Sequence, residues 1–237
     1  MSAIDTKRLC EKAAAYGVDL SAVAPQLAAY AQMLVEYNEK VNLTAITDAE
    51  GIEDRHFIDS LLLASQPEVQ GSLVDVGTGA GFPGLPLRIL EPSLQLTLLD
   101  SLGKRVNWLA SVCNTLGLEG VECLHARAEE QALVDGYRDG FDYAVSRAVA
   151  SLELLCELCL PYLKVGGRFL AMKGVDSGEE INHAARCISI LGGRLLPSVD
   201  YVIPGANVRH RVVLVEKCTP TPNGYPRRWA KIQKAPL

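Results

Sequence analysis

The pattern of apolar and polar positions divides the chain into a helical first part and a longer part in which strands alternate with helices. Between residues 5 and 66 the apolar side chains recur at helical spacing, as they do at Leu27, Tyr30, Ala31 and Leu34. The sequence Thr-Asp-Ala-Glu at 47–50 has the form of a capping box. It predicts a further helix over about 49–65.

From residue 72 onward, short apolar runs alternate with helical patterns. The predicted strands cover residues 73–76, 94–99, 121–124, 143–146 and 168–172, with helices near 86–90, 104–116, 128–133 and 152–163. This alternation is typical of a parallel sheet covered on both faces. Two later runs, 199–203 and 211–216, are joined by a short loop and should pair antiparallel at one edge. We therefore expect an α/β fold with a mostly parallel, Rossmann-like sheet, an antiparallel edge strand and an N-terminal helical extension.

The first predicted sheet strand runs into a turn with three glycines in five residues, Gly77, Gly79 and Gly81. Glycine permits positive φ and has no Cβ, so a ligand can lie directly against such a backbone. Pro83 follows where a helix would start, and proline suits that position. A strand, a bare turn and a helix N-terminus together form the nucleotide-binding corner of an open α/β sheet.

Two kinds of nucleotide fit this turn. Counted from Gly79 it matches G-x-G-x-x-G, with Asp100 about 20 residues further on, as in dinucleotide sites. However, a pyrophosphate needs the first glycine directly after the strand. That glycine is Gly77, and counting from it the third glycine falls on Phe82. Asp75 would also repel a pyrophosphate but suit an ammonium and a sulfonium, which favours S-adenosylmethionine (SAM) over NAD.

The composition is that of an ordinary globular protein, with 237 residues of which 49% are hydrophobic and 22% charged. No apolar run approaches the ~20 residues that span a bilayer. Seven cysteines without regular spacing fit a reducing compartment, so we expect a cytoplasmic protein. The single C-x-x-C, at Cys156 and Cys159, lies in an apolar helical run and predicts buried thiols, with no metal site.

The charge is unevenly distributed. From Gly205 to the end there are seven basic residues and one acidic residue, a net charge of +6, whereas the preceding 204 residues hold 16 basic and 27 acidic residues, a net charge of −11. A basic end on an acidic body fits a phosphate-binding surface. A merely solvated tail is the alternative.

In such a sheet the ligand lies beyond the carboxyl ends of the strands. Asp100 ends the second strand and is placed to accept hydrogen bonds from ribose hydroxyls. Ala128 and Glu129 follow the third strand, where backbone and a carboxylate could read an adenine edge. The alternative for Glu129 is a charge that stabilises a helix N-terminus. Arg147 ends the fourth strand.

From residue 30 to 228 the chain resembles the RsmG (GidB) family of 16S rRNA guanine-N7 methyltransferases, which are class I, SAM-dependent enzymes. The resemblance rests on motifs along the whole chain, at residues 37–44, 55–60, 75–84, 100–105, 127–129, 146–148, 173–174 and 209–210. Gly-Phe-Pro-Gly after the turn, with the Asn-Leu-Thr and Arg-His segments, is more specific than the glycines alone. The chain departs from the family's pattern after Arg228. There Trp229 and its neighbours replace small, Gly- or Pro-containing residues and lysine.

The resemblance implies SAM as cofactor, guanine 527 of 16S rRNA or of a small-subunit precursor as substrate, and no obligate protein partner. It also implies cofactor-binding residues, namely Gly77, Phe82, Ala128, Glu129 and Arg147, with Asp75, Gly79 and Asp100 in support. Candidates for RNA phosphates or the target base are Lys173, Arg209, His210 and Arg211, whose alternative role is to solvate an edge strand. His56 could shape the substrate side or be a packed helix histidine. We expect three parts, a helical extension at 1–70, a SAM-binding domain at 71–217 and a basic tail at 218–237.

The chemistry fits this substrate independently of the resemblance. Guanine N7 carries an in-plane lone pair and no proton, so its attack on a sulfonium methyl needs alignment and no general base. Methylation of an exocyclic amine calls for Asn or Asp and prolines after the fourth strand, where this chain has Ser146 and Arg147. Three alternatives remain open, a small-molecule methyltransferase, an NAD-dependent oxidoreductase and a ribosome-assembly factor that binds SAM.

Overall fold

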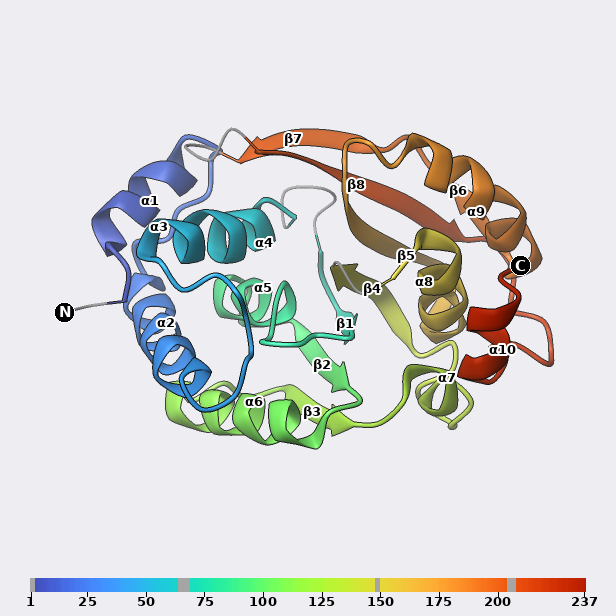
Figure 1. Ribbon diagram of the computed structural model, residues 1–237, viewed down its shortest axis with the longest axis horizontal. Helices are drawn as coiled ribbons and strands as arrows, with labels where there is room; N and C mark the ends of the chain where they lie inside the picture. Colours follow the sequence, from blue (N-terminus) through green and yellow to red (C-terminus); the bar gives the residue numbers. More distant parts are fainter. Residues whose placement is uncertain (1–2, 64–68, 148–149, 204–207) are drawn as a thin grey trace.

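The centre of the molecule is a mixed β-sheet. The computed structural model describes residues 3–63, 69–147, 150–203 and 208–237. Within these residues the sheet has eight strands in the order β3-β2-β1-β4-β5-β8-β6, and β7 also pairs with β8 (Figure 1). The strands are β1 (Ser72–Val76), β2 (Gln95–Asp100), β3 (Val121–His125), β4 (Phe141–Arg147), β5 (Leu163–Gly174), β6 (Gly193–Leu195), β7 (Val199–Ile203) and β8 (Val208–Lys217).

The first five strands form the parallel part of the sheet. β1 lies between β2 and β4 and pairs in parallel with both, and β3 and β5 extend the parallel arrangement on the two sides. β8 pairs antiparallel with β5. The expected mostly parallel sheet with an antiparallel margin is therefore confirmed. The strand order reverses on the two sides of β1, which makes the carboxyl end of β1 the expected ligand-binding position.

Helices cover both faces of the sheet (Figure 1). One buried cluster joins the N-terminal helices, α5 and α6 to one face, and another joins α7, α8, α9 and α10 to the opposite face. The helices are α1 (Thr6–Ala14), α2 (Ala24–Asn38), α3 (Ala49–Gly51), α4 (Asp59–Leu62), α5 (Gly84–Leu90), α6 (Gly103–Leu116), α7 (Ala128–Gln131), α8 (Leu152–Cys159), α9 (Gly178–Ile190) and α10 (Trp229–Lys234), with a π-helical segment η1 (Ile52–Ile58) and a 3-10 turn η2 (Leu160–Tyr162).

The N-terminal helices share a core with the sheet. Tyr30 of α2 is fully buried, and its ring stacks on Phe82 with centroids 5.2 Å apart.

The predicted helix after residue 48 is present, but its cap is Asp48, whose carboxylate accepts a hydrogen bond from the Gly51 N–H. The predicted capping box is thus wrong by one residue. The middle of the predicted helix is η1, which is π-helical, a form frequently found at functional sites.

The last third of the chain holds three elements that are not among those expected from the sequence, namely α9, β6 and α10. The predicted antiparallel pairing of the two late strands is confirmed, since β7 pairs antiparallel with β8. However, β8 lies between β5 and β7, so it is not itself an edge strand. The division into parts at 1–70, 71–217 and 218–237 stays a prediction.

The helical run with the C-x-x-C is α8. Cys156 and Cys159 are both buried, which confirms the expected buried thiols. Among the described residues, no group of three or more His, Cys, Asp and Glu side chains could hold a metal ion. No helix in the described part of the chain is long and apolar enough to cross a membrane.

Candidate active site

The glycine turn after β1 has the positive φ angles that its three glycines permit. The φ angles are 73° at Gly77, 60° at Gly79 and 92° at Gly81, all in the region that favours glycine. The Gly77 N–H donates to the Leu99 carbonyl at 2.8 Å, which holds the turn against the end of β2. A Cβ at Gly81 would lie 2.6 Å from the Tyr30 hydroxyl, so packing against α2 also requires glycine there.

Asp75 lies behind this turn and is fully buried. Its Oδ2 accepts hydrogen bonds from the Thr78 hydroxyl at 2.8 Å and from the Gly84 N–H at 2.9 Å. Burial raises its pKa to about 6, and its Oδ1 has no hydrogen-bond partner among the described residues. Asp75 therefore braces the turn and the start of α5 without lining the cavity in front of them. Its expected attraction to a ligand's ammonium group is not a direct contact in this geometry.

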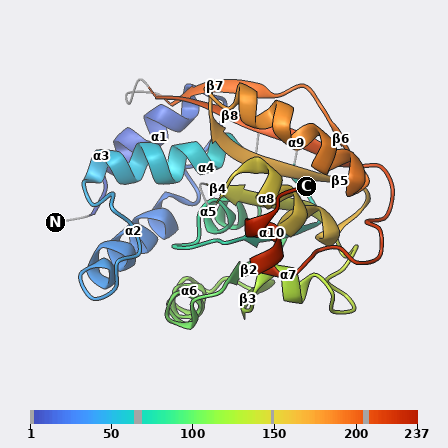
Figure 2. The ribbon, with the colours of Figure 1, turned by 45° about the vertical axis from the view of Figure 1, so that its right-hand side comes forward.

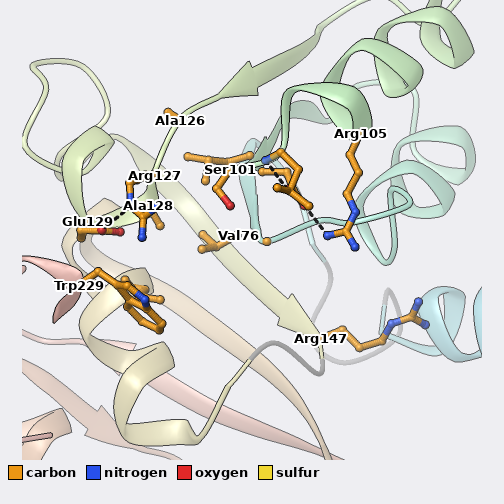
Figure 3. Close-up of a pocket in the computed structure, with 14 residues that line it drawn as sticks. Val76, Ser101, Arg105, Ala126, Arg127, Ala128, Glu129, Arg147 and Trp229 are labelled. Atoms are coloured by element: carbon orange, nitrogen blue, oxygen red, sulfur yellow. Dashed lines mark hydrogen bonds and ion pairs between the residues drawn. The ribbon is translucent and has the colours of Figure 1, made fainter. Parts of the chain in front are cut away.

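A cavity of about 520 Å³ opens where β1, β2 and β3 end (Figure 3). Residues that follow these three strands form most of its wall, and Arg147, Leu158 of α8 and Trp229 of α10 complete it. The lining residues from the strand ends are Val76, Gly77, Leu99, Asp100, Ser101, Leu102, Arg105, Ala126, Arg127, Ala128 and Glu129. This is the place where an open α/β sheet binds a nucleotide.

Asp100 connects the end of β2 to the glycine turn. Its Oδ1 accepts a hydrogen bond from the Leu102 N–H at 2.9 Å, and its Oδ2 accepts one from the Gly79 N–H at 3.0 Å. Each carboxylate oxygen can accept a second hydrogen bond. Arg105 Nη1 also lies 3.5 Å from Oδ2, so the carboxylate is fixed and Oδ1 keeps acceptor capacity. A contact of Asp100 with ribose hydroxyls stays a prediction.

The end of β3 forms the opposite part of the wall. Ala128 and Glu129 open α7 and are largely buried, and the Arg127 Nε donates to Glu129 Oε1 at 3.0 Å. Figure 3 shows Glu129 beside Trp229, both at the side of the cavity away from Arg105. Backbone, a carboxylate and an aromatic ring therefore meet there, and this combination suits a purine.

A second cavity, of about 390 Å³, adjoins the first. It is lined by residues from the loop before α3, from η1 and α4, and from the ends of β4, β5 and β8, namely Ile46, Arg55, His56, Asp59, Arg147, Met172, Lys173, Gly174 and His210. Arg147 lines both cavities. Both cavities are therefore in contact with this one residue.

The guanidinium of Arg147 points toward the N-terminal helices and away from Glu129 (Figure 3). Its Nη1 donates to the Arg55 carbonyl at 2.7 Å and lies 3.3 Å from Asp59 Oδ2, and its Nη2 lies 3.2 Å from His56 Nδ1. The guanidinium carbon also lies 5.2 Å from the centre of the Phe82 ring. η1 and α4 thus hold Arg147 in one orientation.

His56 is buried and supports Arg147 as a neutral ring. Burial and the charge of Arg147 lower the pKa of His56 to about 3. Because Arg147 can only donate, Nδ1 of His56 accepts, and Nε2 donates to the Thr44 hydroxyl at 2.9 Å. The His56 and Phe82 rings stack at 4.4 Å. His56 is therefore both a packed helix histidine and part of the wall of the second cavity.

Phe82 differs from its expected placement. Its side chain is 4% exposed, packs among Tyr30, His56 and Phe57, and is not part of the wall of the first cavity. The Phe82 ring packs against the His56 ring and lies under the Arg147 guanidinium. A cofactor-binding role for Phe82 stays a prediction, and the position of its side chain favours an indirect role.

Asp59 is the carboxylate that the sequence analysis missed. It is 1% exposed, and its Oδ1 accepts from the Tyr201 hydroxyl at 2.6 Å and lies 2.8 Å from His210 Nδ1. Burial by itself would raise its pKa, but the hydrogen bond to His210 and the charge of Arg147 outweigh burial and hold the pKa below its usual value. Asp59 therefore balances the charge of Arg147.

The four residues expected to contact RNA lie on two faces of the sheet. His210 faces Asp59 and η1, whereas Lys173 and Arg211 are register partners on neighbouring strands and share the other face. Lys173 donates to Glu180 at 2.7 Å, and Arg211 pairs with Asp200 at 2.6 Å. Arg209 is exposed. Lys173 and His210 line the second cavity, and Arg209 and Arg211 do not.

In the sequence, Arg55 to Ser60 are recognisable only as a family motif, which predicts no role for Asp59 and Arg55. Their partners Arg147, Tyr201 and His210 lie about 90 to 150 residues away in sequence. The useful signal was a run of charged side chains inside an otherwise apolar helical pattern, since a buried charge needs a partner. Trp229 was noted only as a departure from the family pattern.

The family model described as rRNA small subunit methyltransferase G (GidB) matches residues 23–202. The ribosomal RNA small subunit methyltransferase G of Alkaliphilus metalliredigens is 46% identical over 214 residues, which are 90% of each chain. The protein of the same name from Clostridium botulinum is 44% identical over 97% of each chain. The similarity therefore extends over nearly the whole length of these relatives.

Solved structures support the same fold. The 1,6-didemethyltoxoflavin-N1-methyltransferase of Burkholderia thailandensis, solved with bound S-adenosylhomocysteine, matches with a TM-score of 0.54 at 16% identity, over 81% of this chain and 90% of that one. TrmN from Thermus thermophilus matches with a TM-score of 0.52 at 20% identity, over 68% of this chain and 48% of that one. At this level of identity the likeness concerns the Rossmann-like methyltransferase fold.

Proposed function

Because the chain belongs to the rRNA small subunit methyltransferase G (GidB) family, we propose that it transfers a methyl group from SAM to N7 of a guanine in 16S rRNA. The observation that supports this most is the pair of adjoining cavities that share Arg147. One has the position of a nucleotide site in this fold, and the other lies beside it with charged and polar side chains. Donor and acceptor could thus meet at their junction.

In this proposal the first cavity holds SAM. The backbone of Gly77 and Gly79 lies along its methionine part, and the Asp100 carboxylate accepts from the ribose hydroxyls. A Cβ at Gly79 would meet no atom nearer than the Gly77 carbonyl at 4.0 Å, so the backbone is open to a ligand there. Ala128 and Glu129 lie at the adenine. Asp75 and Phe82 do not line the cavity and instead support the glycine turn and Arg147.

The bound cofactor supplies a methyl carbon on a positively charged sulfur, which an in-plane lone pair can attack directly. Guanine N7 has such a lone pair and no proton to lose, so the protein's task is alignment. The described side chains between the cavities fit this task, since His56 is held neutral by its contacts and Arg147 is held by four groups of η1, α4 and the glycine turn. The Asp59 carboxylate beside Arg147 limits the repulsion between that guanidinium and a purine that becomes cationic.

The second cavity takes the target guanine in this proposal, with Lys173 and His210 on its wall. Arg209 is the exposed cation on β8 nearest in sequence to this wall and is the best candidate for a phosphate contact. The substrate is naked 16S rRNA or a small-subunit precursor, and the proposed place of action is the cytoplasm, where both occur.

The proposal is tested by methyl transfer from labelled SAM with the purified chain. Small-subunit particles, naked small-subunit RNA and large-subunit RNA are compared as acceptors. We expect label in small-subunit RNA or particles and none in large-subunit RNA. Transfer to small metabolites without RNA would support a small-molecule methyltransferase. SAM binding without transfer, even in a single turnover, would support an assembly factor.

A further inference from the structure

The chain's last segment ends at the cofactor cavity. Trp229, the first residue of α10, is partly buried and lines this cavity with Ala128, Glu129 and Leu158 (Figure 3). α10 packs against α8, and Ile232 on its inner side is fully buried (Figure 2). The segment 218–237 therefore contributes an aromatic ring to a wall otherwise built by the strand ends, the residues that follow them and α8.

Buried contacts attach the start of this segment to the domain. Lys217 is completely buried at the end of β8, and its Nζ donates to the Leu160 carbonyl at 2.6 Å and to the Thr221 hydroxyl at 2.7 Å. Arg138 donates to the carbonyls of Thr221 and Tyr225 at 2.8 and 2.9 Å. These bonds direct the chain from β8 toward α8.

An ion pair anchors the residues directly before α10. Glu157 of α8 is 1% exposed and accepts hydrogen bonds from the Arg227 Nε at 2.8 Å and Nη2 at 2.6 Å. It also accepts from the Arg227 N–H at 2.8 Å, and Arg227 Nη1 donates to the Ala235 carbonyl at 3.0 Å. Such a two-point pair fixes the backbone next to Trp229. Two of the basic residues of this end, Lys217 and Arg227, thus face inward and are not available to RNA.

We propose that Trp229 covers the adenine of the cofactor, so that the C-terminal segment is part of the cofactor site. This inference rests on the proposed function, in which the cavity holds SAM. The ring lies at the end of the cavity where Ala128 and Glu129 present polar groups to a purine edge. An indole is flat and apolar, and it can stack on the face of a purine while those groups bind its edge. The other end of the cavity, at Gly77, takes the amino-acid part.

The test measures binding of two nucleosides to the purified full-length chain by calorimetry, without RNA. S-adenosylhomocysteine has both the adenosine and the amino-acid part, and methylthioadenosine lacks the amino acid. Trp229→Ala should lower the affinity for both ligands by the same factor, roughly five- to fiftyfold, which is the scale of a lost base–aromatic stack. Trp229→Phe should restore most of the affinity. Lys231→Ala, an exposed residue of the same helix, should bind as the unchanged chain does.

Intrinsic fluorescence provides a reading that leaves Trp229 in place. The chain has two tryptophans, and the other, Trp108, is 3% exposed and packs on Tyr37 outside the cavity wall. In Trp108→Phe the remaining emission comes from Trp229, and methylthioadenosine should change it. No change in emission, or equal affinity of Trp229→Ala and the unchanged chain, would overturn the inference. A lower affinity of Trp229→Ala for S-adenosylhomocysteine alone would also overturn the inference, because the ring would then lie at the amino-acid part. If the unchanged chain bound neither ligand, the proposed function itself would fail.

Discussion

Arg147 and Asp59 form an ion pair, with Nη1 3.3 Å from Oδ2, that joins the end of β4 to the N-terminal helices between the two cavities. Asp59 is 1% exposed and the Arg147 side chain 17% exposed, so water screens the pair poorly. The N-terminal extension thus does more than cover the sheet, because it sets the orientation of Arg147, the residue that both cavities share within the described part of the chain.

Asp59→Asn keeps the shape of this side chain and removes its charge. We expect the free energy of unfolding to fall by about 3 kcal/mol, because a largely buried guanidinium loses its counter-charge. We also expect methyl transfer to fall more than SAM affinity does. Denaturant unfolding, calorimetry and transfer rates measure the three effects. Asp200→Asn breaks an exposed pair with Arg211 and is the matched control, with an expected change of about 0–1 kcal/mol. Equal effects of the two variants would remove the special role of Asp59.

Gly77→Val should abolish SAM binding, because its side chain enters the cavity where the ligand must pass the backbone. The change also places a branched residue at a φ of 73°, which costs at least about 1–2 kcal/mol of stability. Gly117→Val separates the two effects. Gly117 ends α6 with a φ of 64° and no atom within 4 Å of a new Cβ. We expect similar loss of thermal stability in both variants and loss of SAM binding only at Gly77. If calorimetry gave both variants the same SAM affinity, the turn would not be the cofactor site.

Arg209→Ala should weaken RNA binding with no effect on SAM affinity. Arg209 is exposed, and each phosphate contact releases counterions, so the log–log slope of RNA affinity against salt should decrease by about 0.7–0.9. Arg211→Ala should change the slope less, because Asp200 already pairs with that guanidinium at 2.6 and 2.8 Å. Filter binding across a salt series measures the slopes. An unchanged slope and unchanged methylation in the Arg209 variant would mean that this arginine only keeps the strand soluble.

His56→Gln should make stability less sensitive to acid. The unfolded histidine takes up a proton near pH 6.5, whereas burial and Arg147 lower the pKa of the folded one to about 3. Between these values the unfolded state binds more protons, so the original chain loses stability relative to the variant as the pH falls, by up to about 1.4 kcal/mol per unit. Burial raises the pKa of Asp75 to about 6 and acts in the opposite direction, so the chains compared must differ only at residue 56. Parallel curves of unfolding free energy against pH would show that His56 is not buried neutral.

The sequence predicted the parts of the fold that local pattern determines. The five parallel strands each contain one of the predicted apolar runs, and the glycine turn is marked by its three glycines. All of them are present. The helix α10 was missed because it is short and buries a single apolar residue, Ile232. The helix α9 was also missed, although Ile181, Ala184 and Ile188 recur in it at helical spacing. The residues proposed to bind the cofactor, namely Gly77, Asp100, Ala128 and Glu129, come together at one cavity because each lies at or after the end of a strand.

The second cavity could not be predicted in the same way. Its geometry depends on contacts between His56 and Arg147 and between Asp59 and Tyr201, which are far apart in sequence and follow from how η1 packs on the sheet. Phe82 shows the same limit. Its place beside the glycines suggested a ligand contact, but α2 supplies Tyr30 as a stacking partner and buries the ring.

The proposed methylation of N7 of a guanine in 16S rRNA can be measured directly. The most direct measurement isolates small-subunit RNA from a strain that lacks the protein, incubates it as RNA and as particles with the purified chain and methyl-labelled SAM, and identifies the labelled nucleoside by mass spectrometry. We expect labelled 7-methylguanosine with the unchanged chain and none of it with Gly77→Val. Label on an exocyclic amine, on a pyrimidine carbon or on a ribose, or no label in either form of the RNA, would contradict the proposal.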